Sequence, residues 1–401
     1  MSIRVPAAAP STMAYDIVVV GAGPAGLAFA RSLDGTKLRI AVIERQRHDM
    51  LADPPCDGRE IALTHRSVAA LRALDAWRRI DPGEIAPLRE ARVLNGASRF
   101  ALSFDTRASG EDRIGQLVPN HLIRRALFEA VAAQRDVTLL AGCGVAAAAT
   151  SGRGAVVTLD DGRVLAARLL VAADSRFSAT RERLGIAAEI NRPGRSMMVC
   201  RVAHEHDHGG VATEWFDHGQ TIAMLPLNGW LSSAVLTLPS AEIERLAALD
   251  RAALGAEITR RFQRRLGTMR LVDDPHVYPL ATTWARHFAA PSAALIGDAA
   301  VGMHPVTAHG FNLGLQGAMT LGALVGTAAA QRRDIASPLL LRRYEAAHRS
   351  ASRPIYTATN LIVSLYTTES PVARLARHAG LRAAARLPIV RHGMSRLLAQ
   401  H

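Results

Sequence analysis

Six residues near the start of the chain have the types and the spacing of a phosphate-binding turn. They are Gly21, Ala22, Gly23, Pro24, Ala25 and Gly26, which match the pattern GxGxxG. In this pattern the first glycine allows a tight turn, the second lets the backbone approach a pyrophosphate, and the third lets a helix pack close to a sheet. The free N–H groups at the start of that helix can hold phosphate oxygens. The pattern therefore predicts dinucleotide binding.

The residues around this turn favour the same chemistry. Residues 15–20 and 38–44 are β-branched, apolar runs, typical of buried parallel strands, and residues 27–33 between them have helical character. Glu44 ends the second run, 23 residues after Gly21, where a carboxylate can accept hydrogen bonds from a ribose. The alternative is a glycine turn in an unrelated α/β protein.

A second motif, Leu295 to Ala300, follows about 270 residues later and reads L-I-G-D-A-A. Asp298 at the end of a predicted strand (residues 293–296) can accept hydrogen bonds from the polyol of a long cofactor. The alternative is that Asp298 caps a helix. Residues 305–315 form a glycine-rich loop that opens a helix, and such a loop can present N–H groups to the edge of a flavin ring.

Together these motifs resemble the single-component flavoprotein aromatic hydroxylases. The resemblance rests on G-A-G-P-A-G (21–26), on L-L-V-A-A-D-S-R-F-S-A-T-R (169–181) and on G-D-A-A…H-P…G-F-N-L-G-L (297–315). D-G-R-E-I-A-L-T-H (57–65) and L-R-R-Y-E-A-A-H-R (341–349) are most similar to the ring hydroxylases of ubiquinone biosynthesis, including the demethoxyubiquinol hydroxylase type. The resemblance covers nearly the whole chain after Tyr15 and is weakest over residues 186–278.

The resemblance implies FAD as cofactor and assigns roles to particular residues. Asp298 would hold the ribityl chain, and His304 and Pro305 are the catalytic candidates. For His304 a packed structural role is the alternative, and Arg59 has the alternative of a solvated surface arginine. Gly310, Phe311, Asn312 and Leu313 would approach the isoalloxazine, while the adenosine and pyrophosphate would be held by Gly21, Gly23, Pro24, Ala25, Gly26, Glu44, Arg45 and Arg59.

Four residues depart from the family pattern. Ser175 stands where the family usually has the glycine of Asp-Gly, and Val301 stands where a histidine is common. Ala308 and Gly317 replace a frequent glycine and a frequent aspartate around the flavin loop. The first departure concerns the handling of the nicotinamide cofactor, and the last two concern which member of the ubiquinone group this chain is.

The activity that the resemblance implies is an FAD-dependent monooxygenase. It would hydroxylate an electron-rich aromatic ring, in a polyprenylated phenol or quinol of ubiquinone biosynthesis, with O2 and reducing equivalents from NAD(P)H. Alternatives with the same fold are a prenyl reductase, a halogenase or a hydroxylase of a soluble phenol. The Trp-x-Trp-x-Ile signature of halogenases is not evident in the sequence. A basic, non-enzymatic binding protein is the remaining alternative.

We predict an α/β fold with two domains. The strand-like runs at 196–202, 211–216, 220–227 and 230–238 are separated by turn residues and indicate an antiparallel sheet. The substrate pocket is expected between this sheet and the loop around Pro305, with Met224 and Leu236 in its wall. A Rossmann-like FAD-binding domain would comprise residues 14–80, 106–190 and 280–345, the substrate domain 81–105 and 191–279, and C-terminal helices 346–401.

The charge of the chain is concentrated at its C-terminal end. The formal net charge is +13, and residues 371–401 contain six arginines and no acidic residue. We expect amphipathic helices there that contact an anionic membrane surface or a membrane-bound complex; packing of their apolar side on the FAD domain is the alternative. No recognised nucleic-acid motif accompanies the arginines, so nucleic acid is not expected as a partner.

The expected location is the cytoplasm, with peripheral contact on the inner face of the membrane as a second expectation. The three cysteines form no CxxC pair, and the first twelve residues lack the apolar core of a signal peptide. The charge-free run 299–331 contains histidines, a proline and many glycines, so it is not expected to span a membrane.

A histidine cluster, H-E-H-D-H at 204–208, raises the question of a metal site. Alternating residues of a strand share one face, which would bring the three imidazoles together. The sequence offers no further ligand set, so we interpret the cluster as the solvated end of a hairpin and expect no metal.

Overall fold

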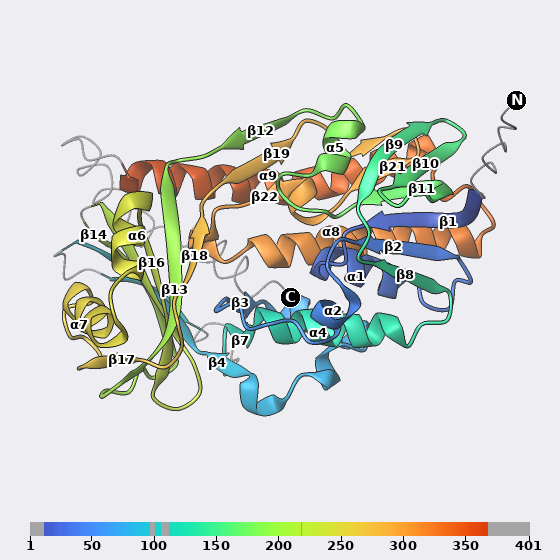
Figure 1. Cartoon of the computed structure of the whole chain (residues 1–401). Coiled ribbons are helices and arrows are strands. Elements are labelled where there is room, and N and C mark those ends of the chain that lie inside the picture. The colour runs from blue at the N-terminus through green and yellow to red at the C-terminus, as the bar shows by residue number, and fades with distance from the viewer. Residues whose placement is uncertain (1–11, 97–100, 106–111, 218, 368–401) are drawn as a thin grey trace, which may run out of the picture.

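Two large sheets and a group of long helices form the molecule (Figure 1). The computed structural model describes residues 12–96, 101–105, 112–217 and 219–367. The first sheet, with its helices, carries the N-terminal glycine motif, and the second carries the strands between residues 195 and 279. The predicted α/β fold with a second sheet is confirmed.

The first sheet has parallel strands at its centre, as predicted for a dinucleotide-binding fold. Strands β11, β1, β2 and β8 lie side by side in parallel, and β21 continues the parallel pairing beyond β11. Strands β9 and β10 extend β11 as an antiparallel hairpin. The bounds are β1 (Thr12–Val20), β2 (Ile40–Glu44), β8 (Val137–Ala141), β9 (Val145–Ser151), β10 (Gly154–Leu159), β11 (Val164–Ala172), β20 (Ala289–Ala290) and β21 (Ala293–Leu295).

The second sheet is antiparallel except for one pair of strands. Its order is β17-β13-β16-β15-β14-β5-β6, with β18 also paired to β13. Strand β5 runs parallel to β14, because it enters the sheet from a distant part of the chain and not through a hairpin. The bounds are β5 (Glu90–Asn95), β6 (Ala101–Phe104), β13 (Arg195–His204), β14 (Val211–Asp217), β15 (Gln220–Pro226), β16 (Leu231–Pro239), β17 (Met269–Leu271) and β18 (His276–Pro279).

Two three-stranded sheets complete the strands of the described residues. The first is ordered β3-β7-β4 and the second β12-β19-β22. Both are antiparallel in their described pairs. Their bounds are β3 (Glu60–Leu63), β4 (Ala86–Leu88), β7 (Gly115–Pro119), β12 (Ala188–Asn191), β19 (Thr282–Ala285) and β22 (Val301–Gly302).

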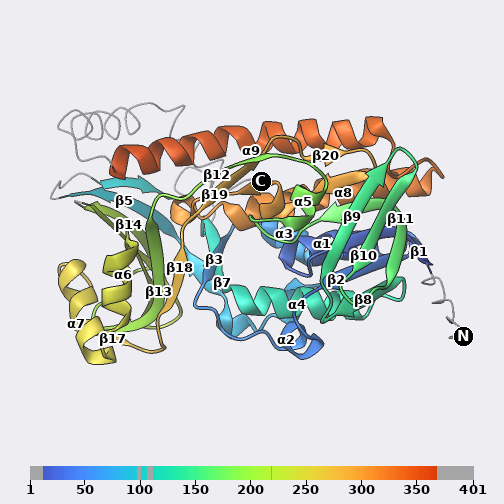
Figure 2. The same ribbon diagram turned by 45° about the horizontal axis from the view of Figure 1, so that its top comes forward.

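Helices cover both sheets (Figures 1 and 2). Helices α6 and α7 lie on the second sheet, α9 extends from the first part toward the second sheet, and the other helices belong to the part that contains the first sheet. Four short 3-10 turns, η1 to η4, separate some of these elements. The helix bounds are α1 (Pro24–Ser32), α2 (His48–Ala52), α3 (His65–Ala73), α4 (Asn120–Ala132), α5 (Ala179–Arg183), α6 (Ser240–Ala247), α7 (Arg251–Arg261), α8 (Gly310–Ala330) and α9 (Pro338–Thr367).

Helix α8 is long and apolar enough to cross a membrane, but it lies in the protein core. Of its most apolar 18-residue window, 44% is buried inside the molecule. Two glycines explain its close packing, because a Cβ at Gly322 would lie 2.0 Å from Ser32 Oγ of α1, and one at Gly317 would lie 2.7 Å from the ring of His348 on α9. Its apolar side chains therefore serve the contacts with α1 and α9.

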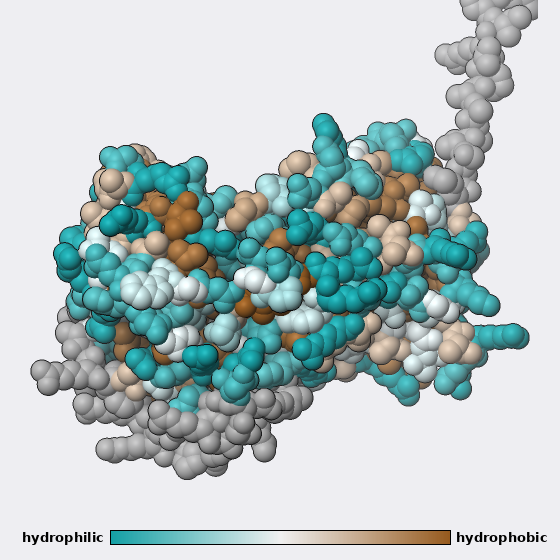
Figure 3. All heavy atoms as spheres, turned by 90° about the horizontal axis from the view of Figure 1, so that it is seen from below, coloured by the Kyte–Doolittle hydropathy of each residue, from teal (hydrophilic) through white to brown (hydrophobic). Residues whose placement is uncertain are grey.

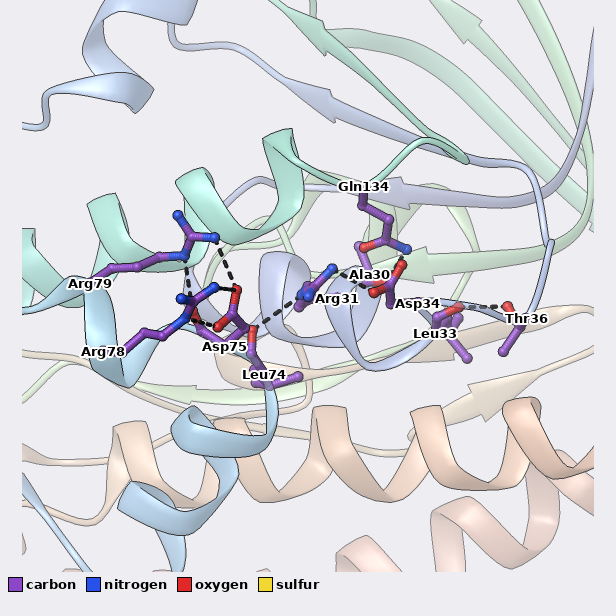
Figure 4. A network of polar contacts seen from close by, with 10 residues as sticks. All are labelled: Ala30, Arg31, Leu33, Asp34, Thr36, Leu74, Asp75, Arg78, Arg79 and Gln134. Carbon is purple, nitrogen blue, oxygen red and sulfur yellow. Dashed lines mark hydrogen bonds and ion pairs between the residues drawn. The ribbon is translucent and has the colours of Figure 1, made fainter.

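The C-terminal end of α1 is held in place by polar contacts, shown in Figure 4. Arg31 donates to the carbonyl of Leu74 at 3.2 Å and to Asp34 at 2.8 Å, while the Gln134 amide donates to the carbonyl of Ala30 at 3.2 Å. These bonds fix the helix whose first turn carries the glycine motif against the segments that follow α3 and α4. Orientation of α1 matters because its N-terminus is the proposed phosphate site.

The outer surface is mixed, with hydrophobic areas that are small and separate on the face that Figure 3 shows. Most of this face is hydrophilic, in keeping with the high arginine content of the chain. Residues 368–401, where the amphipathic helices are predicted, lie outside the described residues.

Candidate functional site

Three segments that are far apart in the sequence meet at the carboxyl end of the central strands. A Cβ built at Gly297 would lie 2.9 Å from the Cβ of Ala25, so the second motif touches the first. A Cβ built at Gly314, in the first turns of α8, would lie 3.4 Å from the Cα of Gly297. The turn after β1, the turn after β21 and the start of α8 thus share one site. Open α/β sheets bind their ligands at this edge.

Each glycine of the first motif has a distinct environment. Gly21 has a φ of +108°, and a Cβ there would lie 2.5 Å from the carbonyl oxygen of Ala173. A Cβ at Gly26 would lie 2.0 Å from the carbonyl oxygen of Gly21, so both positions exclude a side chain. At Gly23 no heavy atom of the described residues would lie within 4 Å of a Cβ. The space beside Gly23 is therefore not filled by the described residues, and a pyrophosphate can occupy it.

Pro24 begins α1 and has no N–H to leave unsatisfied, and Ala25 follows it. Glu44 supports this turn from the end of β2. Its carboxylate accepts a hydrogen bond from the N–H of Ala22 at 2.8 Å and another from the N–H of Gln46 at 2.9 Å. An ionised carboxylate has about four acceptor positions. The remaining positions can accept ribose hydroxyls, which fits the predicted role of Glu44.

Arg59 belongs to a fixed polar network and is not a freely solvated side chain. It donates twice to the carboxylate of Asp57, at 3.1 and 2.6 Å, and its guanidinium lies 5.4 Å from the centre of the Tyr278 ring. Asn120 donates to the same carboxylate at 2.7 Å. The arginine and the amide hold the pKa of Asp57 below its usual value against the effect of burial. The network therefore holds the positive charge of Arg59 in one place, where it can serve a phosphate group.

Two further arginines lie near this edge. Arg45 is exposed and close to Gly144, where a Cβ would lie 3.4 Å from its Nε. Arg124 of α4 is half-buried and donates to the side chain of Gln46 at 2.9 Å. Burial lowers the pKa of Arg124, while the carboxylates of Asp57 and Glu44 act in the opposite direction. Arg124 was not singled out in the sequence, because only the fold brings it near Glu44.

Asp298 does not cap a helix, so this alternative reading is wrong. It lies within the 3-10 turn η3 (Gly297–Ala299), whose cap position is Ile296 and has no side-chain bond. Its Oδ2 accepts two hydrogen bonds from Arg176, one from Nε at 3.2 Å and one from an Nη at 2.8 Å. The Asp298 side chain is 35% exposed, so its carboxylate can accept hydrogen bonds from the hydroxyl groups of a ribityl chain.

The segment that follows β11 holds Arg176 in position. Asp174 accepts hydrogen bonds from the hydroxyl of Ser178 and from the N–H of Thr180. Arg181 is 1% exposed and donates to the carbonyl of Ala299 at 3.1 Å, which ties this segment to the Asp298 turn. The motif at residues 169–181 therefore shapes the same site.

The flavin loop runs from η4 (Pro305–Thr307) into α8. His304 is buried, and its Nδ1 accepts a hydrogen bond from the N–H of Val306 at 3.2 Å. Burial, followed by the charges of Arg195 and Arg176, lowers the pKa of His304 to about 4. The imidazole is therefore neutral near pH 7. This capping bond supports the structural reading of His304, with Pro305 as the first residue of the turn.

The first turn of α8 offers its backbone rather than its side chains. The Asn312 amide donates to the carbonyl of Ala62 at 2.9 Å and accepts from the N–H of Thr64 at 3.2 Å. Its side chain thus joins α8 to the segment between β3 and α3. Gly310 and Phe311 precede it at the start of the helix, where N–H groups lack partners within the helix, while the N–H of Leu313 donates to the carbonyl of His309 at 2.9 Å.

The site's residues fit FAD, since they combine an uncrowded glycine turn, a ribose acceptor, a polyol acceptor and a helix N-terminus. The family model of the FAD binding domain matches residues 14–359 of the 401-residue chain. The chain belongs to this FAD-binding family. It is an FAD-dependent monooxygenase, a class that fits both the FAD-binding family and the relatives named as hydroxylases.

Three relatives cover almost the whole chain. The ubiquinone hydroxylase UbiM of Neisseria meningitidis is 45% identical over 93% of this chain and 82% of its own length. The ubiquinone hydroxylase UbiL of Rhodospirillum rubrum is 33% identical over 95% of this chain and 90% of its own. The 3-demethoxyubiquinol 3-hydroxylase of Escherichia coli is 28% identical, with shares of 94% and 96%.

Solved structures show the same fold at lower identity. The p-nitrophenol 4-monooxygenase PnpA of Pseudomonas putida superposes with a TM-score of 0.76 at 18% identity and covers 96% of this chain and 97% of its own. PqsL of Pseudomonas aeruginosa, a probable FAD-dependent monooxygenase, gives a TM-score of 0.72 at 22% identity, with shares of 92% and 100%.

The second sheet of this monooxygenase has two different faces, and one sequence expectation about them is wrong. Met224 and Leu236 do not face the FAD side. They belong to a buried cluster with Ile243 and Leu246 of α6 and Leu254 of α7. These two helices cover the sheet on the side away from the FAD domain (Figure 1). The alternation of apolar residues identifies the strands, but it does not tell which of the two faces meets the FAD domain.

The opposite face of the sheet meets the FAD domain. The hydroxyl of Tyr278 on β18 donates to the carbonyl of Asp57 at 2.6 Å. Arg201 on β13 donates to Glu60, which is 2% exposed, at 2.8 Å. Arg195, also on β13, is close enough to His304 to lower its pKa. The side chains that share this face with these residues therefore point toward the flavin loop.

His204 corrects the reading of the histidine cluster as solvated. It is 6% exposed, with Nδ1 bonded to the carbonyl of His206 at 2.8 Å and Nε2 bonded to Ser232 Oγ at 3.0 Å. His208 is bonded through Nε2 to the carbonyl of Leu227 at 2.9 Å. The imidazoles thus fix the ends of neighbouring strands. Within the described ranges, no group of three potential ligands could hold a metal ion.

Proposed function

We propose that this monooxygenase hydroxylates the aromatic ring of a polyprenylated phenol or quinol in ubiquinone biosynthesis, with O2 and reducing equivalents from NAD(P)H. The observation that carries the proposal is the meeting of Ala25, Gly297 and Gly314 at one sheet edge. The names of the UbiM and UbiL relatives support the substrate class. Bound FAD would supply the activation of oxygen, which no side chain can perform.

The proposal places FAD across the strand ends. The pyrophosphate lies at Gly21 to Gly26, the ribose at Glu44, and the positive charges of Arg45 and Arg59 lie on the adenosine side. Asp298, held by Arg176, accepts the ribityl hydroxyls. The backbone around Gly310, Phe311, Asn312 and Leu313 approaches the isoalloxazine.

The protein's own part is to bind, orient and shield the ring. The sheet face that meets the FAD domain carries Met197 and Val199, which pack with Leu280 in an apolar cluster. Such a wall suits an apolar aromatic substrate and keeps water from the reacting atoms. Neutral His304 and Pro305 lie in the flavin loop, where they shape the site between cofactor and substrate.

Gly23→Val tests the placement of FAD. The variant should purify with less than about a tenth of the wild-type flavin, because the branched side chain fills the space of the pyrophosphate. Its apoprotein should unfold like the wild-type apoprotein, since no heavy atom of the described residues lies within 4 Å of that Cβ. Flavin absorbance per polypeptide and thermal unfolding measure both quantities.

Gly152→Val, in the turn between β9 and β10, is the matched control. Its Cβ also meets no heavy atom of the described residues within 4 Å, so this variant should keep both fold and flavin. Asp298→Ala should lose flavin through loss of the polyol acceptor. Full flavin content in both Gly23→Val and Asp298→Ala would contradict the placement.

We infer that the enzyme is cytoplasmic and binds the inner face of the membrane peripherally through residues 371–401. The support is the set of six arginines without an acidic residue. Each arginine near an anionic bilayer contributes on the order of 1 kcal/mol. A polyprenylated substrate stays in the bilayer, so surface contact would bring the site to it.

Vesicle flotation tests this contact. The full chain should float with vesicles of phosphatidylglycerol and phosphatidylcholine and remain behind with phosphatidylcholine alone. A chain that ends at Ser370 should float with neither, while it retains FAD. Equal flotation of both chains, or of neither, would reject the membrane role of this segment.

A further inference from the structure

Glu214 is an acidic side chain on the sheet face that meets the FAD domain. It lies near the middle of β14, directly opposite Ala223 of β15 and Val93 of β5. Its neighbour Trp215 belongs to the cluster under α6 and α7, so Glu214 points to the opposite face. The pairing continues from Ala223 through Val235 of β16 to Val199 of β13. Glu214 therefore lies in the same row across the sheet as Val199, which belongs to the apolar cluster with Met197 and Leu280.

The described strand positions around Glu214 on this face are uncharged. The neighbouring positions on the three strands carry no acidic, basic or histidine side chain, and they are Ala91, Val93, Asn95, Ala212, Phe216, Thr221, Ala223 and Leu225. Among the described residues, Glu214 has neither a hydrogen-bond partner nor an ion-pair partner. A carboxyl group in such a place is costly unless a ligand completes its hydrogen bonds.

Burial raises the pKa of the Glu214 carboxyl to about 8, and no charge on the described residues contributes. The side chain remains partly accessible, so a ligand can reach it. Two further ionisable groups of this sheet face are Arg201, which donates to Glu60 at 2.8 Å, and His276 of β18, which lies next to Val199 and against Gly58. His304 is neutral because its pKa is about 4, and Arg195 donates to the carbonyls of Gly219 and Thr237.

We propose that Glu214 binds the ring hydroxyl of the phenolic substrate and takes its proton while an oxygen atom is added to the ring. The proposal rests on the proposed function, because it assumes a phenol or quinol on this sheet face. A ring hydroxyl has a pKa near 10 when free, and its deprotonation makes the ring more electron-rich. A carboxylate in an apolar wall is suited to accept that proton.

The proton transfer balances within the complex. The O–H bond of the ring hydroxyl breaks, its electron pair stays on the ring oxygen, and the proton forms a bond with a carboxylate oxygen of Glu214. O2 supplies the oxygen atom and the reduced cofactor supplies two electrons, and the second oxygen atom of O2 leaves as water. When the ring regains aromaticity, the substituted carbon releases its hydrogen to water as a proton. Glu214 then returns its own proton to the ring oxygen.

Ligand binding tests the contact without turnover. The oxidised holoenzyme is titrated with 2-farnesylphenol and, separately, with 2-farnesylanisole, whose methylated oxygen cannot donate, and flavin absorbance reports binding. Wild type should prefer the phenol, and the preference should grow roughly tenfold between pH 6.5 and 9 as Glu214 ionises, since a hydrogen bond to a charged group is the stronger kind. Glu214→Gln should abolish this pH dependence.

Glu90→Gln is the matched control. Glu90 lies on β5 in the register position of Val211, on the other face of the same sheet, and it accepts hydrogen bonds from Arg92. This variant should keep the wild-type pH dependence. The contact is overturned if Glu214→Gln binds the phenol and the anisole with wild-type preference at both pH values.

Turnover tests the proton transfer. Glu214→Gln should retain FAD and reduction by NAD(P)H but form hydroxylated product roughly a hundredfold more slowly, with the reduced oxygen released as hydrogen peroxide. Glu214→Asp should recover part of the rate. Wild-type product formation in Glu214→Gln with an unchanged pH profile would overturn the assignment. A wild-type enzyme that binds the phenol with the stated pH dependence but hydroxylates no phenol or quinol would contradict the proposed function alone.

Discussion

At the scale of single residues, two departures from the family pattern keep the backbone of the glycine they replace. Ser175 has a φ of +130° and Ala308 a φ of +52°, both in regions that favour glycine. The turns after β11 and before α8 are therefore shaped as glycine would shape them. A side chain in such a backbone conformation destabilises the fold by on the order of 1–3 kcal/mol at each of the two positions.

Ser175→Gly should stabilise the enzyme by about 1 kcal/mol. Glycine adopts the observed φ without steric cost, and the change removes one exposed hydrogen bond, from the N–H of Phe177 at 3.3 Å. Urea unfolding of the holoenzyme measures the free energy. Ala149→Gly in β9, at an exposed position outside the positive-φ set, should instead destabilise it by roughly 0.5–1 kcal/mol. A destabilised Ser175→Gly would show that this backbone is not strained.

The residues that could be predicted from the sequence are those whose role is set by a local pattern. Gly21, Gly26 and Glu44 follow from spacing along one βαβ unit, and the structure gives them the expected surroundings. Arg124 and Glu214 could not be found in this way. Their neighbours come from distant strands and loops, so only the register of the sheets shows what they face.

At the scale of elements, the close contact between α8 and α9 depends on a missing side chain. The ring of His348 is 2% exposed and lies against the ring of Tyr344 and near that of Phe288. The hydroxyl of Tyr344 in turn donates to the carbonyl of Leu295 at 2.6 Å, just before the Asp298 turn. Gly317, where the family often has an aspartate, leaves the space for this imidazole.

Gly317→Ala should destabilise the enzyme by about 1–3 kcal/mol, although alanine favours helices. Its Cβ would lie 2.7 Å from two atoms of the His348 ring, which is packed and cannot move freely. Gly326→Ala, on the same helix, meets its neighbours at 3.8 and 3.9 Å and should stabilise by up to about 1 kcal/mol. Urea unfolding compares the two, and equal effects would contradict this account of the helix contact.

The strands of the second sheet show where prediction from local pattern ends. Alternation of apolar residues locates β13 to β16 to within two residues at each end. The same alternation could not tell which face meets α6 and α7, so Met224 and Leu236 were placed on the wrong side. The parallel pairing of β14 with β5 was also missed, because strand partners far apart in the sequence leave no local signal.

At the scale of the whole molecule, the two large sheets have different proposed roles. The first sheet and α8 bring together the three segments proposed to hold FAD, and the second sheet offers a largely apolar face to the flavin loop. This division was predictable because the family motifs all lie on the first part, while the texture of the strands changes after residue 195. The contacts that link the two parts could not be predicted. They join Arg201 to Glu60 and Tyr278 to Asp57.

Oxygen-isotope labelling tests the central claim most directly. The FAD-loaded enzyme is given 2-farnesylphenol, NADH or NADPH and 18O2 in ordinary water, and the product is analysed by mass spectrometry. The account predicts a ring-hydroxylated product that contains one 18O atom, formed only when flavin, reductant and oxygen are all present. A hydroxyl oxygen that comes from water, or a product formed by flavin-free protein, would contradict a flavin-dependent monooxygenase.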